Sequence, residues 1–391
     1  MDRVSFVDVS PASDIGLEGS RVQNVNSRPQ AGDVEGVWNP GPVQSVAPDM
    51  RAIVHRLPGD SSMLELTERD IPEPGSGELR VRVVVSGVNP TDWKSRRGTG
   101  TAAAAAGESV PNQDGAGIVD AVGEGIAGFA WGDRVWLAIS AWQRPASGTA
   151  QEFTITLADR AFPLPDEVTF DVGASLGVPA VTAHRALTVS EDGPARLHPG
   201  ALAGKTVLVA GGAGAVGHAA IQLARWAGAT VITTVSSADK GALAEAAGAH
   251  HVVNYRETDA AERIRAIAPG GVDLVVEVAA GANAELDQAV THERSTIASY
   301  GNDGGAPVTI DFGRAIMHNL RYQFVLIYTM GARAWAAAGE DVTAAARDGA
   351  LVIGDGAGLP VHRYPLEQTA AAHDAVEAGT VGKVLIDVAS R

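Results

Sequence analysis

The sequence predicts an α/β protein in which a doubly wound parallel sheet follows a partly open β-barrel. A glycine-rich turn joins an apolar strand at residues 207–210 to a helix at 218–227. Beyond residue 180 helix and strand alternate, whereas residues 50–179 hold several short strands and few helices. With 391 residues, 45% of them hydrophobic, and 46 glycines, the chain is long enough for two domains and too rich in glycine for a helical bundle.

The turn carries a G-x-G-x-x-G motif formed by Gly212, Gly214 and Gly217. Glycines allow such a turn without Cβ clashes, and they let the backbone amides of Ala215, Val216 and Gly217 approach a pyrophosphate at the helix N-terminus. Glycine-rich turns also serve plain hairpins and helix caps, so the strand before the motif and the amphipathic helix after it decide the interpretation. We therefore predict a Rossmann-type dinucleotide-binding domain.

The next strand, residues 230–235, indicates which dinucleotide binds. It ends at Ser236, where domains specific for NAD usually carry an acidic residue for the ribose hydroxyls. This chain has Ser236, Ser237 and Lys240 instead, two hydroxyl donors and a cation that suit a 2′-phosphate, so we predict NADPH as the cofactor. In the alternative, the serines cap the next helix and Lys240 is a solvated surface charge, and both can be true of the same residues.

Composition excludes several classes of function. A formal net charge of −16 argues against nucleic acid and against anionic membrane surfaces as partners. The absence of cysteine excludes disulfides, thiolate zinc sites and a cysteine nucleophile. Neither an apolar segment of about twenty residues nor a basic start followed by a hydrophobic core is present. We expect a cytoplasmic protein that acts on a small molecule.

The chain divides into three parts by its patterns. Residues 1–49 are polar and punctuated by prolines, so we interpret them as an N-terminal arm or linker. In this arm, Trp38 lies between valines and prolines and can dock in extended form on a groove or partner; a disordered leader ahead of a start at Met50 is the alternative. We assign residues 50–179 and 318–391 to a barrel-type catalytic domain and 180–317 to the dinucleotide-binding domain.

Two late segments are predicted strands. The run from Tyr322 to Tyr328 has only uncharged side chains and is a plausible edge strand. Pairing with a second copy would satisfy its exposed hydrogen-bonding groups, so we expect a homodimer there. The run at residues 383–388 is expected to return to the barrel.

Residues 173–177 spell G-x-S-x-G, the nucleophile elbow of α/β-hydrolases. An elbow must follow a central strand, yet residues 164–168 look like a loop that enters a helix, which residues 177–179 then interrupt. The context therefore argues against hydrolysis.

Together the motifs resemble the medium-chain dehydrogenase/reductase superfamily, and within it the zinc-free quinone oxidoreductases that include zeta-crystallin. The resemblance covers about residues 50–388 and implies a GroES-like barrel beside the Rossmann sheet. The motifs that carry it are GVNPTDWKSRRG at 87–98, GAGIVDAVG at 115–123, GDRV at 132–135, AGGAGAVG at 210–217 and NYR at 254–256.

The resemblance implies a site without zinc. Where the zinc-dependent branch has a Cys and a His-Glu pair, this chain has Asn89 and Gln113-Asp114, so a tetrahedral zinc site cannot be assembled there. It places Asn89 beside the nicotinamide, where its amide can bind the substrate oxygen or the ribose. We expect the loss of Asn89 to affect turnover rather than folding.

Other residues follow from the same resemblance. Asp92 and Arg96 are expected nearby as an orienting pair. Many relatives have a Tyr where this chain has Lys94, so Lys94 or water must donate the proton. Alternatively, Asn89 and Asp92 simply cap a turn.

Further contacts complete the expected site. Trp142, in the loop at residues 138–149, could stack on a planar acceptor, or it is plain core. Tyr255, Tyr300 and Lys383 are expected at the cofactor. The predicted activity is hydride transfer from NADPH to a quinone or to an α,β-unsaturated carbonyl, an enone. An enoyl thioester reductase-like enzyme of a biosynthetic pathway and a non-catalytic NADPH-binding protein are the alternatives.

Overall fold

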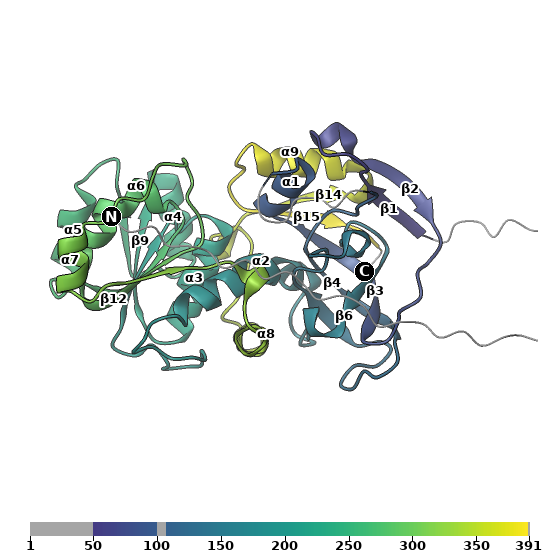
Figure 1. The fold of residues 1–391 in the computed structure, drawn as a ribbon, viewed down its shortest axis with the longest axis horizontal. Coiled ribbons are helices and arrows are strands. Elements are labelled where there is room, and N and C mark those ends of the chain that lie inside the picture. Colours follow the sequence, from purple (N-terminus) through teal and green to yellow (C-terminus); the bar gives the residue numbers. More distant parts are fainter. Residues whose placement is uncertain (1–49, 100–106, 390–391) are drawn as a thin grey trace, which may run out of the picture. The chain divides into compact units, whose positions relative to one another are not determined.

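The computed structural model describes residues 50–99 and 107–389, so the interpretations of residues 1–49 and of Trp38 lie outside it. The described strands form a six-stranded sheet, a seven-stranded sheet and a two-stranded sheet made of β1 (Met50–Val54) and β2 (Glu65–Arg69) (Figure 1). The helices are α1 (Pro90–Arg96), α2 (Phe170–Leu187), α3 (Ala215–Trp226), α4 (Ala238–Ala246), α5 (Ala260–Ile267), α6 (Ala280–Val290), α7 (Phe312–Met317), α8 (Ala332–Arg347) and α9 (Thr369–Glu377).

The six-stranded sheet is the predicted doubly wound parallel sheet. Its order is β10-β9-β8-β11-β12-β13, and every neighbouring pair is parallel. This order places the first strand of the unit in the middle of the sheet, as dinucleotide-binding folds do. The strands are β8 (Thr206–Ala210), β9 (Thr230–Val235), β10 (His251–Asn254), β11 (Val272–Glu277), β12 (Thr291–Ser299) and β13 (Arg321–Phe324).

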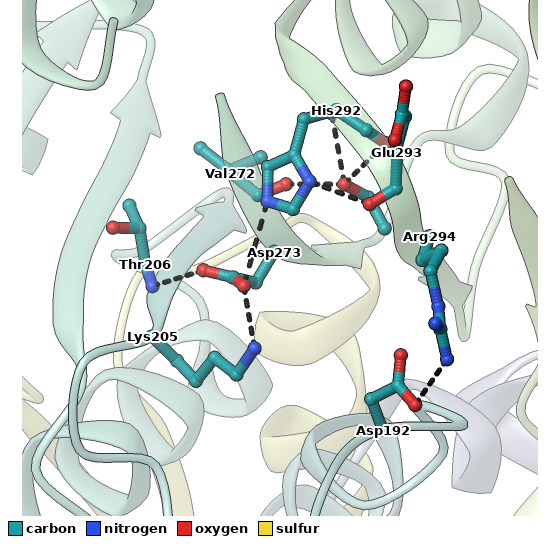
Figure 2. Close-up of polar contacts among 9 residues, drawn as sticks. Asp192, Lys205, Thr206, Val272, Asp273, His292, Glu293 and Arg294 are labelled. Carbon is teal, nitrogen blue, oxygen red and sulfur yellow. Dashed lines mark hydrogen bonds and ion pairs between the residues drawn. The ribbon is translucent and has the colours of Figure 1, made fainter. Parts of the chain in front are cut away.

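Polar contacts link three strands at the amino-terminal edge of this sheet (Figure 2). Asp273, at the start of β11, accepts hydrogen bonds from Lys205 Nζ at 2.9 Å and from the Thr206 N–H at 2.8 Å. In β12, the Ser295 hydroxyl donates to the Val272 carbonyl at 2.8 Å. These contacts join β8, β11 and β12 at the edge opposite the glycine-rich turn, which leaves the carboxyl edge as the side on which such sheets bind ligands.

The seven-stranded sheet is the predicted barrel. Its order is β14-β15-β3-β4-β5-β7, with β6 also pairing with β3. The expected return of the C-terminal strand is confirmed, because β15 pairs antiparallel with β3 and sets Val384 opposite Val88. The strands are β3 (Glu78–Val88), β4 (Asp114–Val122), β5 (Arg134–Leu137), β6 (Phe153–Leu157), β7 (Ala161–Pro163), β14 (Val361–Pro365) and β15 (Lys383–Asp387).

Strand β13 has the predicted edge position but not the predicted length. It ends at Phe324, and a 3₁₀ turn, η4 (Ile327–Thr329), follows where the strand was expected to continue. Because β13 is the edge strand of the six-stranded sheet, that sheet extends beyond residue 317, where the sequence predicted the end of the dinucleotide-binding domain. None of the helices in the described residues combines the length and hydropathy needed to cross a membrane.

The predicted interruption of the helix at residues 177–179 is wrong, since α2 runs through Pro179. The glycines of G-x-S-x-G have a packing role: a Cβ on Gly177 would lie 2.1 Å from Asp114 Oδ1, and one on Gly173 would lie 2.9 Å from the Ala116 Cβ. Ser175 lies inside the helix and donates its hydroxyl to the Asp171 carbonyl at 2.8 Å. The motif therefore lets α2 approach β4 closely and forms no nucleophile elbow.

Candidate functional site

The turn between β8 and α3 is shaped by its glycines. The Gly211 and Gly212 N–H groups both donate to the Thr234 carbonyl, at 3.1 and 3.3 Å. A Cβ on Gly212 would lie 2.2 Å from Thr233 Oγ1, and one on Gly217 would lie 2.3 Å from the Gly211 carbonyl oxygen. Only glycine lets the turn lie so close to β9 and lets α3 start so close to the turn.

The N-terminus of α3 is open to an anion. Gly214 is the N-cap, is exposed, and offers no side chain to the first turn. The N–H groups of Ala215, Val216 and Gly217 stand in the first turn, where a helix has no acceptors of its own. The helix dipole adds positive potential at this end. The turn therefore fits the pyrophosphate of a dinucleotide.

The end of β9 supplies hydroxyls and a cation on the same edge. The Ser237 hydroxyl accepts a hydrogen bond from the Lys240 N–H at 3.3 Å, so Ser237 caps α4, as the alternative interpretation held. Ser236 is partly exposed between β9 and this cap. Within the described residues, the Lys240 ammonium has no ion-pair partner. This arrangement fits a phosphate group beyond the end of β9.

Two tyrosines follow strands of the six-stranded sheet at its carboxyl edge, Tyr255 after β10 and Tyr300 after β12. The Tyr255 N–H donates to the Val235 carbonyl at 3.1 Å, and its side chain is 50% exposed. The Tyr300 N–H donates to the Glu277 carbonyl at 2.9 Å, and burial, followed by the charge of Glu277, raises the pKa of its phenol. Tyr255, Ser236 and the glycine-rich turn thus follow the neighbouring strands β10, β9 and β8, whereas β11 lies between β8 and the strand before Tyr300, and Lys383 belongs to the barrel.

Asn89 lies at the centre of a buried polar cluster in the barrel. Its side chain is 2% exposed; Nδ2 donates to Asp114 Oδ2 at 2.7 Å, and Oδ1 accepts from Lys383 Nζ at 2.7 Å. Lys383 is 1% exposed and also donates to the Val88 carbonyl at 3.3 Å. The Lys383 ammonium is thus committed to the barrel, and its contact with the cofactor stays a prediction.

Two carboxyl groups share this cluster. Asp92 accepts from the Asn89 N–H at 2.7 Å and from the Gln113 N–H at 3.0 Å, while Asp114 also accepts from the Val178 N–H at 2.7 Å. Burial, and then the charge of Asp114, raises the pKa of Asp92 to about 8. Burial raises the pKa of Asp114 to about 6, against the opposing effect of Lys383, whose own pKa burial lowers.

The other charged residues of α1 point elsewhere. The expected pairing of Asp92 with Arg96 is wrong, because the Arg96 guanidinium donates to Glu377 of α9 at 2.9 Å. Lys94 is exposed, and its ammonium lies 5.6 Å from the centre of the Trp93 ring. No contact of the buried cluster includes Lys94, so its part in proton transfer stays a prediction.

Trp142 lies against a residue that sequence reasoning missed. Its ring centre is 4.7 Å from that of Tyr328 in η4, at an angle of 37°. The Tyr328 hydroxyl is 2.8 Å from Thr91 Oγ1, at a sequence separation of 237 residues. No sequence signal links two residues so far apart, whereas Asp114 was visible as the residue that stands in the place of a zinc-branch acid.

The donor set of the cluster differs from that of a metal centre. Among residues 50–99 and 107–389, no group of three or more His, Cys, Asp or Glu side chains is arranged to hold an ion. The ammonium of Lys383, itself a cation, lies beside the Asn89 amide oxygen instead.

Comparisons with known proteins agree with this geometry. The family described as an alcohol dehydrogenase GroES-like domain matches residues 75–166, and the one described as a zinc-binding dehydrogenase matches 215–344. The quinone oxidoreductase of Lama guanicoe is 30% identical over 341 residues, which cover 86% of this chain and 97% of that protein.

Solved structures show the same fold. A mycobacterial quinone oxidoreductase has a TM-score of 0.74 at 29% identity and covers 86% of this chain and 99% of its own. The Escherichia coli quinone oxidoreductase complexed with NADPH has a TM-score of 0.71 at 26% identity and covers 87% of this chain and 100% of its own.

Proposed function

Because the chain belongs to the quinone oxidoreductase family of the medium-chain dehydrogenase/reductase superfamily, we propose that it reduces a quinone or an enone with NADPH and without zinc. The observation that carries this proposal is the open N-terminus of α3 with Lys240 on the same edge of the sheet. The solved structure of the Escherichia coli quinone oxidoreductase contains NADPH, which supports the same cofactor here.

We assign the parts of the cofactor to named groups. The N–H groups of Ala215, Val216 and Gly217 would hold the pyrophosphate. Ser236, Ser237 and Lys240 would hold the 2′-phosphate, and the exposed ring of Tyr255 offers a surface on which the adenine can stack. Tyr300, which directly follows β12, is the remaining residue that we assign to the cofactor.

The barrel cluster would receive the acceptor. When bound, the reduced nicotinamide supplies a hydride. Asn89 donates one of its two Nδ2 hydrogens to Asp114, which leaves the other for the oxygen on which negative charge develops. Lys383 and Asp114 hold both ends of the amide, so they act on the acceptor through Asn89.

The proposed function is tested by following NADPH oxidation with a panel of quinones, enones and an enoyl thioester, before and after exhaustive chelation. We expect turnover with a quinone or a simple enone, at a rate that chelation leaves unchanged. A rate that falls on chelation and returns with zinc would contradict the zinc-free mechanism. Binding of NADPH without turnover of any acceptor would favour a non-catalytic role.

Lys240→Ala is expected to weaken NADPH binding about tenfold while NADH binding stays nearly unchanged. One charge-assisted contact with the 2′-phosphate, of roughly 1.4 kcal/mol, accounts for this factor. Dissociation constants for both nucleotides can be measured by fluorescence titration. Lys205→Ala, at the amino-terminal edge (Figure 2), is the matched control. Equal affinities of the unaltered protein for NADPH and NADH would contradict the assignment.

We also propose that two copies of the chain pair through β13. The edge strand and the neighbouring helix expose large apolar side chains, with Phe324 67%, Phe312 74% and Met317 78% exposed. An unpaired edge strand beside an apolar surface favours association with a second copy. Sedimentation of the full chain tests this, and a monomer at micromolar concentration would contradict it.

A further inference from the structure

We propose that Tyr328 is the proton donor of the reaction, and that Thr91 positions its phenol and returns the proton to it. This inference rests on the proposed function. It assigns the proton transfer to a phenol from η4, whereas the sequence offered only Lys94 or water at α1.

Tyr328 connects the two parts of the site. Tyr328 lies in η4, shortly after β13. The Val325 N–H, between β13 and η4, donates to the Ser299 carbonyl at the end of β12 at 2.8 Å, so η4 begins at the carboxyl edge of the six-stranded sheet. The Tyr328 hydroxyl is 2.8 Å from that of Thr91. Thr91 lies in the first turn of α1, between Asn89 and Asp92 of the buried cluster. The phenol therefore reaches from the edge that binds the nucleotide to the residues that would receive the acceptor.

The surroundings hold the phenol in place and keep it protonated. The Trp142 ring packs against it at 4.7 Å, and α2 contacts η4. Burial, followed by the charges of Asp92 and Asp114, raises the pKa of the phenol, although the bond to Thr91 opposes this. A neutral phenol with a raised pKa keeps its proton at neutral pH and gives it up only as negative charge develops on the acceptor oxygen.

The proton step balances as follows. When bound, NADPH would supply a hydride by loss of its C4–H bond and become NADP⁺. The hydride forms a C–H bond at the electron-poor carbon of the acceptor, and the displaced electron pair moves to the carbonyl oxygen. The O–H bond of Tyr328 then breaks, and a new O–H bond forms on that oxygen. A proton from solvent, relayed through the Thr91 hydroxyl, then restores the phenol, so one solvent proton is consumed in each turnover. The acceptor thus gains one hydride and one proton.

The test compares Tyr328→Phe and Thr91→Val with Tyr364→Phe, a control in β14. Phe keeps the ring against Trp142 but has no proton, so Tyr328→Phe is expected to lower kcat about 10²-fold. The NADPH dissociation constant and the melting temperature should hardly change. The loss should shrink for quinones whose reduced forms are more acidic, since these oxyanions need the proton less. Thr91→Val should slow turnover less than Tyr328→Phe.

A second readout needs no turnover. Ultraviolet titration of tyrosinate should show that Tyr328→Phe removes a tyrosine that ionises above the usual range. Unchanged kcat in Tyr328→Phe, or a loss of the same size for every quinone with a matching drop in melting temperature, would overturn the donor role alone. An unaltered protein that reduces no acceptor would overturn both the donor role and the proposed function.

Discussion

Lys383→Met is expected to lower the free energy of unfolding by about 3–5 kcal/mol at neutral pH, because it removes one partner of a buried charged network. The Lys383 ammonium is the cation whose charge acts on Asp114 and Asp92, and it donates to Asn89 Oδ1 at 2.7 Å. Met fills a similar volume, so the loss reports the missing charge rather than a cavity. Chemical denaturation measures it.

The free energy of unfolding lost in Lys383→Met should increase as pH rises. Both carboxyl groups have pKa values above the ordinary 3.8 in the folded protein, about 8 for Asp92 and about 6 for Asp114. For such groups the folded state is favoured below the ordinary pKa, and this advantage is lost as pH rises through the folded value. The charge of Lys383 lowers both pKa values, so removal of its ammonium raises them further. The variant should therefore be nearly normal at about pH 5 and most destabilised at about pH 8.

The matched control is Lys205→Met. Lys205 pairs with Asp273 at 2.9 Å, but 41% of its side chain is exposed, so its loss should cost less than about 1 kcal/mol. Adding Asp114→Asn to Lys383→Met should restore part of the stability, since it removes the carboxylate left without its cation. A deficit that is equal at both pH values would contradict the electrostatic role of Lys383.

The fold could be read from the sequence wherever pattern and local geometry agree. The strand predicted at residues 230–235 has the bounds of β9, because its apolar residues face buried positions on both sides of a parallel sheet. The end of β13 could not be read, because residues 322–328 are all uncharged although the backbone turns at η4. Uncharged residues are compatible with a turn as well as with a strand, so composition does not distinguish the two.

The site divides in the same way. The phosphate-binding turn is local in sequence, and its glycines are required by contacts within a few residues or with the next strand, as the 2.2 Å approach at Gly212 shows. The barrel cluster is not local, because Asn89 and Lys383 are 294 residues apart in the chain. Spacing could not predict that Lys383 holds the Asn89 amide, nor that the Val178 N–H donates to Asp114 from within α2.

Asn89→Ala is expected to lower kcat/KM by an amount that corresponds to about 2–4 kcal/mol of lost transition-state stabilisation. This is the cost of losing a donor that binds mainly a developing oxyanion. The sequence alone predicted that folding would be spared, but the amide bonds two charged partners, Asp114 and Lys383. Its removal should therefore also cost about 1–3 kcal/mol of stability.

Gln288→Ala separates the two effects of Asn89→Ala. Gln288 is a buried amide of α6 that bonds only backbone groups, so its loss should lower stability by a comparable amount and leave kcat/KM unchanged. Melting temperature, NADPH affinity and turnover of the best acceptor are measured on both variants at a temperature where both stay folded. If Asn89→Ala retains full turnover, or if Gln288→Ala loses as much, Asn89 is a structural residue of the α1 turn, and the oxyanion donor must lie elsewhere in the site.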